Sequence, residues 1–173
     1  MTVRKYSKRS AWIHWSSAGL IFLTIPVGLA MSETTPDAAK LALYWVHIVT
    51  GGLVFALAIF HIYVYFTDER PPPLVTGSPL RDKLAAILHR ILTILILVLT
   101  GTGVGAVFAT PIATALSRND YQLLASDYDA LLVTIHQVQG IVFLLLIILH
   151  IGGVALYNLR YDQRVFRRMR IKP

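Results

Sequence analysis

The sequence predicts an all-α integral membrane protein, a four-helix bundle with both termini in the cytoplasm. Three observations support this: four long apolar stretches, a low content of charged residues, and a one-sided distribution of lysine and arginine. Only 14% of the 173 residues are charged, whereas a soluble domain carries about 25%. A surface that faces lipid accounts for the missing charge.

The four apolar stretches occupy residues 11–31, 42–66, 84–109 and 131–157. Each reaches the ~20 residues that a helix needs to span a bilayer. Polar or proline-rich connectors separate them, and the run Pro71-Pro72-Pro73 predicts a stiff, extended connector between the second and third stretch. The length favours one domain, so residues 1–173 form a single transmembrane unit.

The basic residues predict the orientation of the bundle. With the N-terminus inside, 14 of the 16 lysines and arginines fall in inner segments, and only Lys40 and Arg118 lie outside. Such an excess marks the cytoplasmic side. The net charge of +7 therefore indicates membrane orientation, and we expect no nucleic-acid partner. Five carboxylates make the outer loops acidic: Glu33, Asp37, Asp120, Asp127 and Asp129.

Six histidines carry the chemical signal, and all lie within or at the edge of the apolar stretches. They are His14, His47, His61, His89, His136 and His150. A single histidine in a membrane helix often only bonds a neighbouring helix. Six of them, without any intramembrane carboxylate, favour metal ligands, because ionisable groups are costly in lipid and usually functional. The absence of cysteine excludes iron–sulfur clusters and thiolate sites.

Spacing divides the histidines into two levels. His136 and His150 are 14 residues apart, so they share one helix face at an axial separation of ~21 Å. This predicts two metal centres stacked across the membrane. His47 is the other histidine at the outer level, which pairs it with His136. At the inner level, His150 can pair with His14, His61 or His89.

Two neutral imidazoles on facing helices suit the axial ligation of haem iron. Glycines next to three of the histidines would leave room for a porphyrin, although they could also serve only to pack helices. His14 is followed one turn later by the small Ser17 and Ala18, whereas His61 is followed by Tyr65. We therefore prefer His14 as the inner partner. The rival pairing of His61 with His150 stays open, because His47 and His61 are also 14 residues apart. The glycines in question are Gly51, Gly52, Gly140, Gly152 and Gly153.

Several short pieces, in this order and spacing, carry a resemblance to a known family. They are Tyr6-Ser7, Ile13-His14-Trp15, Val46-His47 with Gly51, Leu88-His89, His136, His150 and Arg168-Met169. Together they resemble the prokaryotic cytochrome b561 family over nearly the whole chain. The resemblance implies two haem b groups whose iron is held by His47 and His136 near the outer face, and by His14 and His150 near the inner face. His61 stands where we would expect arginine, which leaves the inner site less well defined than the outer one.

The resemblance also implies a function. We expect a multi-pass protein of the bacterial inner membrane that carries electrons and exchanges them with the quinone pool, as ubiquinone or menaquinone. The alternative is a membrane-anchor cytochrome b subunit of a periplasmic oxidoreductase, such as a hydrogenase or formate dehydrogenase. Some members are similar to superoxide–ubiquinone oxidoreductases, so enzymatic activity stays open, but acidic outer loops would not attract superoxide. We assign no catalytic residue. His89, beside Arg90, either bonds a haem propionate or a quinone, or is only an interfacial polar residue.

Overall fold

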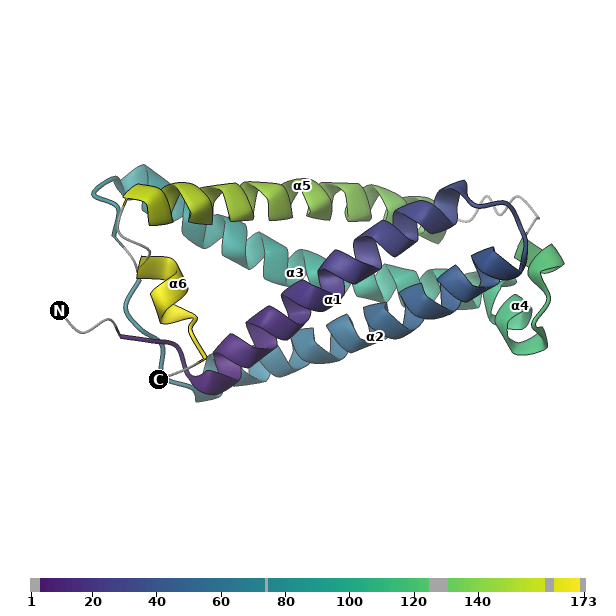
Figure 1. Ribbon diagram of the computed structural model, residues 1–173, viewed down its shortest axis with the longest axis horizontal. Helices are drawn as coiled ribbons and strands as arrows, with labels where there is room; N and C mark the ends of the chain where they lie inside the picture. Colours follow the sequence, from purple (N-terminus) through teal and green to yellow (C-terminus); the bar gives the residue numbers. More distant parts are fainter. Residues whose placement is uncertain (1–3, 74, 125–130, 161–163, 172–173) are drawn as a thin grey trace.

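The computed structural model describes residues 4–73, 75–124, 131–160 and 164–171. Four long helices dominate it, and all four are long and apolar enough to cross a membrane. They are α1 (Lys8–Glu33), α2 (Ala38–Thr67), α3 (Pro79–Ala109) and α5 (Leu131–Arg160). The predicted all-α bundle of four spanning helices is confirmed (Figure 1). The cytoplasmic location of the termini stays a prediction, but both ends of the chain lie at the same end of the bundle.

Helices α1, α2 and α3 begin before the apolar stretches because polar residues and a proline define their starts. Ser7 caps α1, where its hydroxyl accepts a hydrogen bond from the Ser10 amide at 3.1 Å. Asp37 caps α2 in the same way through the Lys40 amide at 2.9 Å. Pro79 opens α3 at a position where the missing N–H costs nothing. Caps of this kind satisfy amides that would otherwise lack a partner.

Three short helical elements were not predicted from the sequence. They are α4 (Ile112–Arg118), the 3₁₀ helix η1 (Tyr121–Leu124) and α6 (Arg164–Arg168). Helix α4 and η1 pack on the start of α2, where a small apolar core forms around Leu41, Ala115 and Leu124. Asn119 ends α4 in the left-handed conformation, with φ of 53°. Helix α4 lies at one end of the bundle, and α6 lies with both termini at the other (Figure 1).

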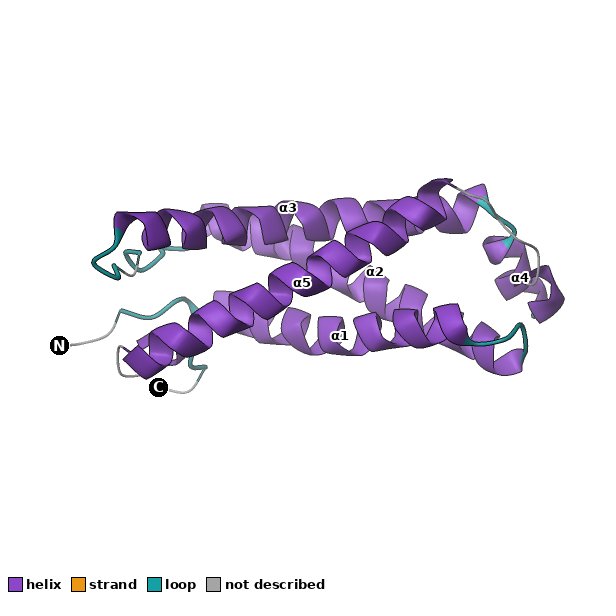
Figure 2. Cartoon of the chain, turned by 90° about the horizontal axis from the view of Figure 1, so that it is seen from above, coloured by secondary structure: helices purple, strands orange, loops and turns teal. Residues whose placement is uncertain are grey.

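The long helices form two close pairs. Helix α1 packs along α2 and α3 packs along α5, while α2 and α3 join the two pairs. Within the described ranges, α5 makes no comparable backbone contact with α1 or α2. Figure 2 shows the same bundle from above, with α4 again at one end. Side chains of α5 that face α1 or α2 therefore lie between the two helix pairs.

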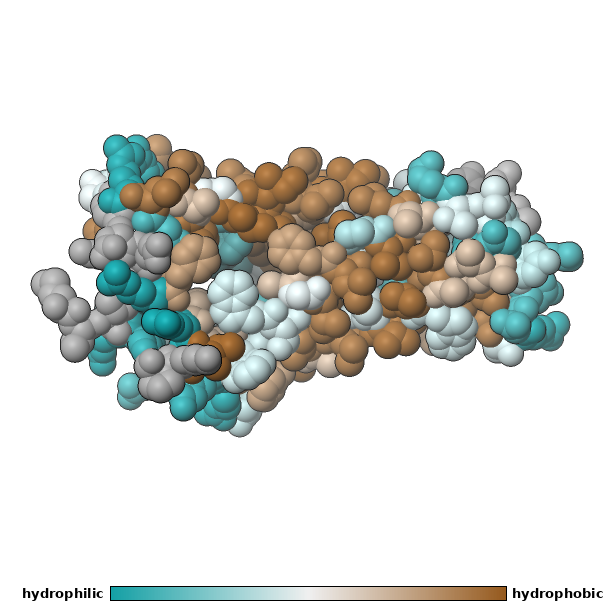
Figure 3. Space-filling model, viewed as in Figure 1, coloured by the Kyte–Doolittle hydropathy of each residue, from teal (hydrophilic) through white to brown (hydrophobic). Residues whose placement is uncertain are grey.

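The outer surface of the bundle is apolar around the middle of its length. Figure 3 shows hydrophobic residues around the centre of the molecule and hydrophilic residues at its two ends. Large apolar side chains such as Phe22, Leu145 and Leu149 are about 60% exposed, at 62%, 60% and 61%. Such a band would be unstable in water and matches the hydrocarbon layer of a bilayer. The chain is thus a multi-pass membrane protein.

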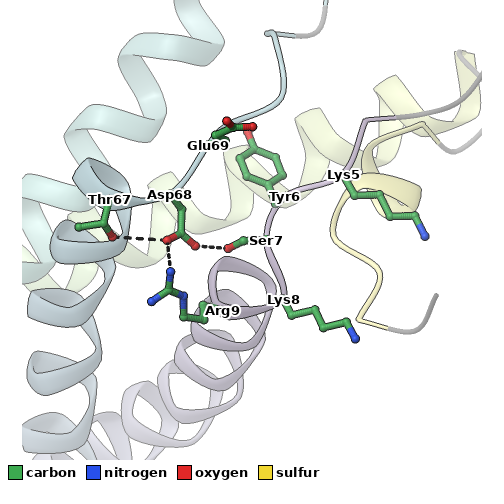
Figure 4. A pocket seen from close by; sticks show the side chains of 8 residues that line it. All are labelled: Lys5, Tyr6, Ser7, Lys8, Arg9, Thr67, Asp68 and Glu69. Atoms are coloured by element: carbon green, nitrogen blue, oxygen red, sulfur yellow. Dashed lines mark hydrogen bonds and ion pairs between the residues drawn. The ribbon is translucent and has the colours of Figure 1, made fainter.

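A carboxylate ties the start of α1 to the end of α2. Asp68, directly after α2, bonds the Ser7 hydroxyl and the Arg9 guanidinium, the latter at 2.6 Å (Figure 4). Its side chain is only 4% exposed. Asp68 therefore closes the α1–α2 pair at the end of the bundle that carries the termini.

Candidate metal centre

Four of the six histidines form two facing pairs. The rings of His47 on α2 and His136 on α5 have centroids 6.0 Å apart and planes at 90°. The rings of His14 on α1 and His150 on α5 have centroids 6.5 Å apart and planes at 66°. We call these the outer pair and the inner pair, after their predicted positions in the membrane. Both pairs reach across from α5 to the α1–α2 side of the bundle.

The ring separations can be compared with coordination geometry. Imidazole nitrogen binds a metal at about 2 Å, so two imidazoles on opposite sides of one iron have centroids about 6.3 Å apart. The separations of 6.0 Å in the outer pair and 6.5 Å in the inner pair lie on either side of this value. His89 is closer to His150, at 5.0 Å, which is too short for an iron between the two rings. The distances favour His14 over His89 as the partner of His150.

Each histidine of the outer pair lies against a glycine of the neighbouring helix. A Cβ atom at Gly28 of α1 would be 2.8 Å from His47 Cε1, and one at Gly103 of α3 would be 2.8 Å from His136 Cε1. Real Cβ atoms essentially never approach so closely. Only glycine therefore lets the two rings lie directly on the helix backbone.

A backbone carbonyl one turn before each glycine fixes the orientation of the ring. His47 Nδ1 lies 3.1 Å from the carbonyl oxygen of Thr24, and His136 Nδ1 lies 2.9 Å from that of Leu99. A carbonyl only accepts, so Nδ1 must donate its proton in both rings. This leaves Nε2 unprotonated and available to a metal, the arrangement usual for histidine ligands.

A further polar contact lies next to His136. The Thr102 hydroxyl lies 2.7 Å from Gln139 Oε1 and 2.9 Å from the Leu99 carbonyl. Gln139 is one turn after His136 on α5. The contact therefore links α3 to α5 beside the ligand and helps to hold the His136 ring in place.

The glycines singled out in the sequence have a different environment from Gly28 and Gly103. A Cβ added at any of them would meet no heavy atom within 4 Å beyond its immediate helix neighbourhood. The structure therefore gives no support to a role in close helix packing. The half-buried Gly51 and Gly140, one turn after the two outer ligands, leave open space of the kind that a flat ligand needs, whereas the other three glycines are exposed. The five glycines are Gly51, Gly52, Gly140, Gly152 and Gly153.

The inner level gathers one histidine from each of the four long helices. His14 on α1 and His150 on α5 form the inner pair, and the ring of His89 on α3 lies 5.0 Å from the His150 ring, whereas His61 is on α2. His61 is exposed, and the structure gives it no ring contact with His150 in the described part of the chain. His89 Nδ1 donates a hydrogen bond to the Ala85 carbonyl of its own helix, at 2.7 Å. The geometry thus brings His14 to His150 and leaves His61 aside.

The donor set fits haem. Among the residues that the structure describes, no three histidine or carboxylate side chains converge on a single ion, as a zinc site would require. Two opposed imidazoles of this kind would hold a haem iron between them, and the haem would supply one-electron chemistry. Gly28 and Gly103 were not among the site residues predicted from the sequence, although Gly103 belongs to a run of small residues, 100–105, that allows a close approach of a helix or a flat ligand. In the sequence, the two glycines can be recognised only as small residues of α1 and α3, the two long helices without an outer ligand.

The fold and the paired histidines define a class of protein, a haem b cytochrome embedded in a membrane. Residues 5–170 match the family model of prokaryotic cytochrome b561, and the chain belongs to this family. The predicted resemblance is thereby confirmed. Membership makes the chain a haem b membrane cytochrome of electron transfer. No curated protein and no solved structure matches it significantly.

Proposed function

We propose that the chain holds two haem b groups in the bacterial inner membrane and carries electrons between them and the quinone pool. In this proposal the outer pair, His47 and His136, ligates one iron, and the inner pair, His14 and His150, ligates the other. The observation that supports it is that both pairs have ring separations close to the value for two imidazoles on one iron, at 6.0 and 6.5 Å. Ubiquinone or menaquinone is the expected exchange partner.

The protein contributes position and environment. Haem supplies reversible one-electron chemistry when it is bound. The Thr24 and Leu99 carbonyls keep Nε2 of the outer ligands free of a proton. His136 and His150 are 14 residues apart on α5, which places them at levels separated by ~21 Å of helix. Ligands at these two levels divide a hydrocarbon layer of ~30 Å into shorter steps for an electron.

The proposal predicts electron transfer from one face of a membrane to the other. The purified protein is reconstituted into lipid vesicles that contain ferricyanide, and a reduced water-soluble quinone analogue is added outside. We expect the trapped ferricyanide to be reduced only when haem-loaded protein is present. The variants His47→Ala and His14→Ala should each keep one haem and lose most of this activity. Equal rates in the wild type, both variants and protein-free vesicles would contradict the proposal.

A further inference from the structure

Two pieces from opposite ends of the chain meet beside the inner pair. The Tyr6 amide donates to the Arg168 carbonyl at 3.1 Å, and the Trp15 indole N–H donates to the Met169 carbonyl at 3.0 Å. Residues 164–171, which we call the C-terminal segment, thus pack against the start of α1. Trp15 is adjacent in sequence to His14, so this contact lies next to an inner ligand.

The C-terminal segment is also bonded to α5 and to the connector between α2 and α3. The Val165 amide donates to Asn158 Oδ1 at 3.1 Å, and the Arg168 guanidinium donates to the Pro72 carbonyl at 2.6 Å. Asn158 is on α5, two turns after His150, and is only 6% exposed. The segment therefore bridges α5 to α1, the two helices that carry the inner pair and lack extensive contact with each other.

The inner pair needs such a bridge more than the outer pair does. Each outer ring lies on a glycine and bonds a carbonyl of the neighbouring helix. In the described residues, neither His14 nor His150 has a corresponding hydrogen bond to the backbone of another helix. The Trp15 ring lies edge-on to the His14 ring, at 5.3 Å between centroids, and the His150 ring lies across from it at 6.5 Å.

We propose that the C-terminal segment sets the distance between His14 and His150, by holding α1 through Trp15 and α5 through Asn158. Trp15 is then a positioning residue for the inner ligand. Its indole N–H anchors the segment while its ring limits the rotation of the His14 ring. This inference rests on the proposed function, because it takes the inner pair to ligate an iron.

The substitution Trp15→Phe tests this with little disturbance, because it keeps an aromatic ring and removes the N–H. Trp12→Phe is the matched control, since Trp12 is on the same helix, is 59% exposed and takes no part in the bridge. Both variants are purified with haem. The readouts are the electron paramagnetic resonance g-values of the ferric haems and the fraction of ferrous haem that binds carbon monoxide. A displaced axial ligand opens a position to carbon monoxide.

We expect Trp15→Phe to shift the g-values of the inner haem and to raise its carbon monoxide binding about tenfold, with the outer haem unchanged. Deletion of residues 164–173 should produce a larger change at the inner haem, and the intact outer haem then reports that the bundle has folded. Trp12→Phe should behave like the wild type. Inner-haem signals that stay at wild-type values in both Trp15→Phe and the deletion would overturn the inference. An equal change in Trp12→Phe would do the same. Fewer than two haems in the wild type would instead refute the proposed function itself.

Discussion

The contact between Gly103 and His136 yields the sharpest prediction about the outer pair. In the variant Gly103→Ala, the new methyl group would lie 2.8 Å from His136 Cε1, whereas ordinary contact begins at 3.4 Å. The ring has to retreat by the difference, about 0.6 Å. Metal–ligand distances tolerate only about 0.2 Å. The His136 nitrogen would therefore be drawn out of reach of an iron held by His47.

The expected effect is a loss of about 10–100-fold in haem affinity at the outer pair, the range seen when groups that orient a metal ligand are altered. This corresponds to about 1.4–2.8 kcal/mol. Alanine favours a helix over glycine by about 0.5–1 kcal/mol. A loss of haem therefore cannot come from a weaker α3, and the inner pair should be unaffected.

The assay is haem titration of the purified variant, followed by optical and electron paramagnetic resonance spectra that distinguish the two haems. Gly101→Ala is the matched control, because a Cβ at Gly101 meets nothing within 4 Å. The reasoning would be refuted if Gly103→Ala bound the outer haem as tightly as Gly101→Ala and the wild type.

The remaining predictions concern the ligands and the polar end of the bundle. His47→Ala or His136→Ala should remove the outer haem and leave the inner one, as measured by haem content per chain. His14→Ala should remove the inner haem, whereas His61→Ala should leave the haem count unchanged, because it is the His14 ring that lies 6.5 Å from the His150 ring. Asp68→Asn should lower the free energy of unfolding by about 1–3 kcal/mol, because it weakens the bonds to α1. Thermal unfolding followed by the haem spectrum measures this last change.

Each of these predictions has a result that would count against it. If His47→Ala or His136→Ala still bound two haems, the outer pair would not be a pair of haem ligands. Loss of a haem in His61→Ala, with retention in His14→Ala, would place both haems between α2 and α5. For Asp68→Asn, the control is Glu69→Gln, an exposed carboxylate next in sequence. Equal stability of these two variants would show that the Asp68 contacts add nothing.

The long helices could be predicted because apolar length and charge distribution depend on the bilayer and hardly on tertiary contacts. The limits of the helices differ from the prediction because caps such as Ser7 and Asp37 are polar and lie outside the apolar stretches. Helix α4 could not be predicted, because a seven-residue helix depends on packing against the start of α2. Helix α6 depends in the same way on contacts with distant parts of the chain.

The pairing of His47 with His136 followed from helix periodicity and topology, and the structure brings these two rings together. The inner partner could not be decided by periodicity, because His14, His61 and His89 all reach that level. The inner partner depends on the relative position of α1 and α5. Contacts between residues that are distant in sequence determine this position. The role of Gly28 was invisible for the same reason, since nothing near it in sequence indicates that His47 of the next helix lies against it.

The central claim is that the chain holds two haem b groups, each between two histidines. The most direct measurement is a pyridine haemochrome assay on the purified protein, with protein concentration from amino-acid analysis, together with electron paramagnetic resonance of the oxidised sample. We predict two non-covalent haem b groups per chain, both low-spin with two imidazole ligands. One haem per chain, covalently attached haem, or a high-spin signal from half of the iron would contradict the account.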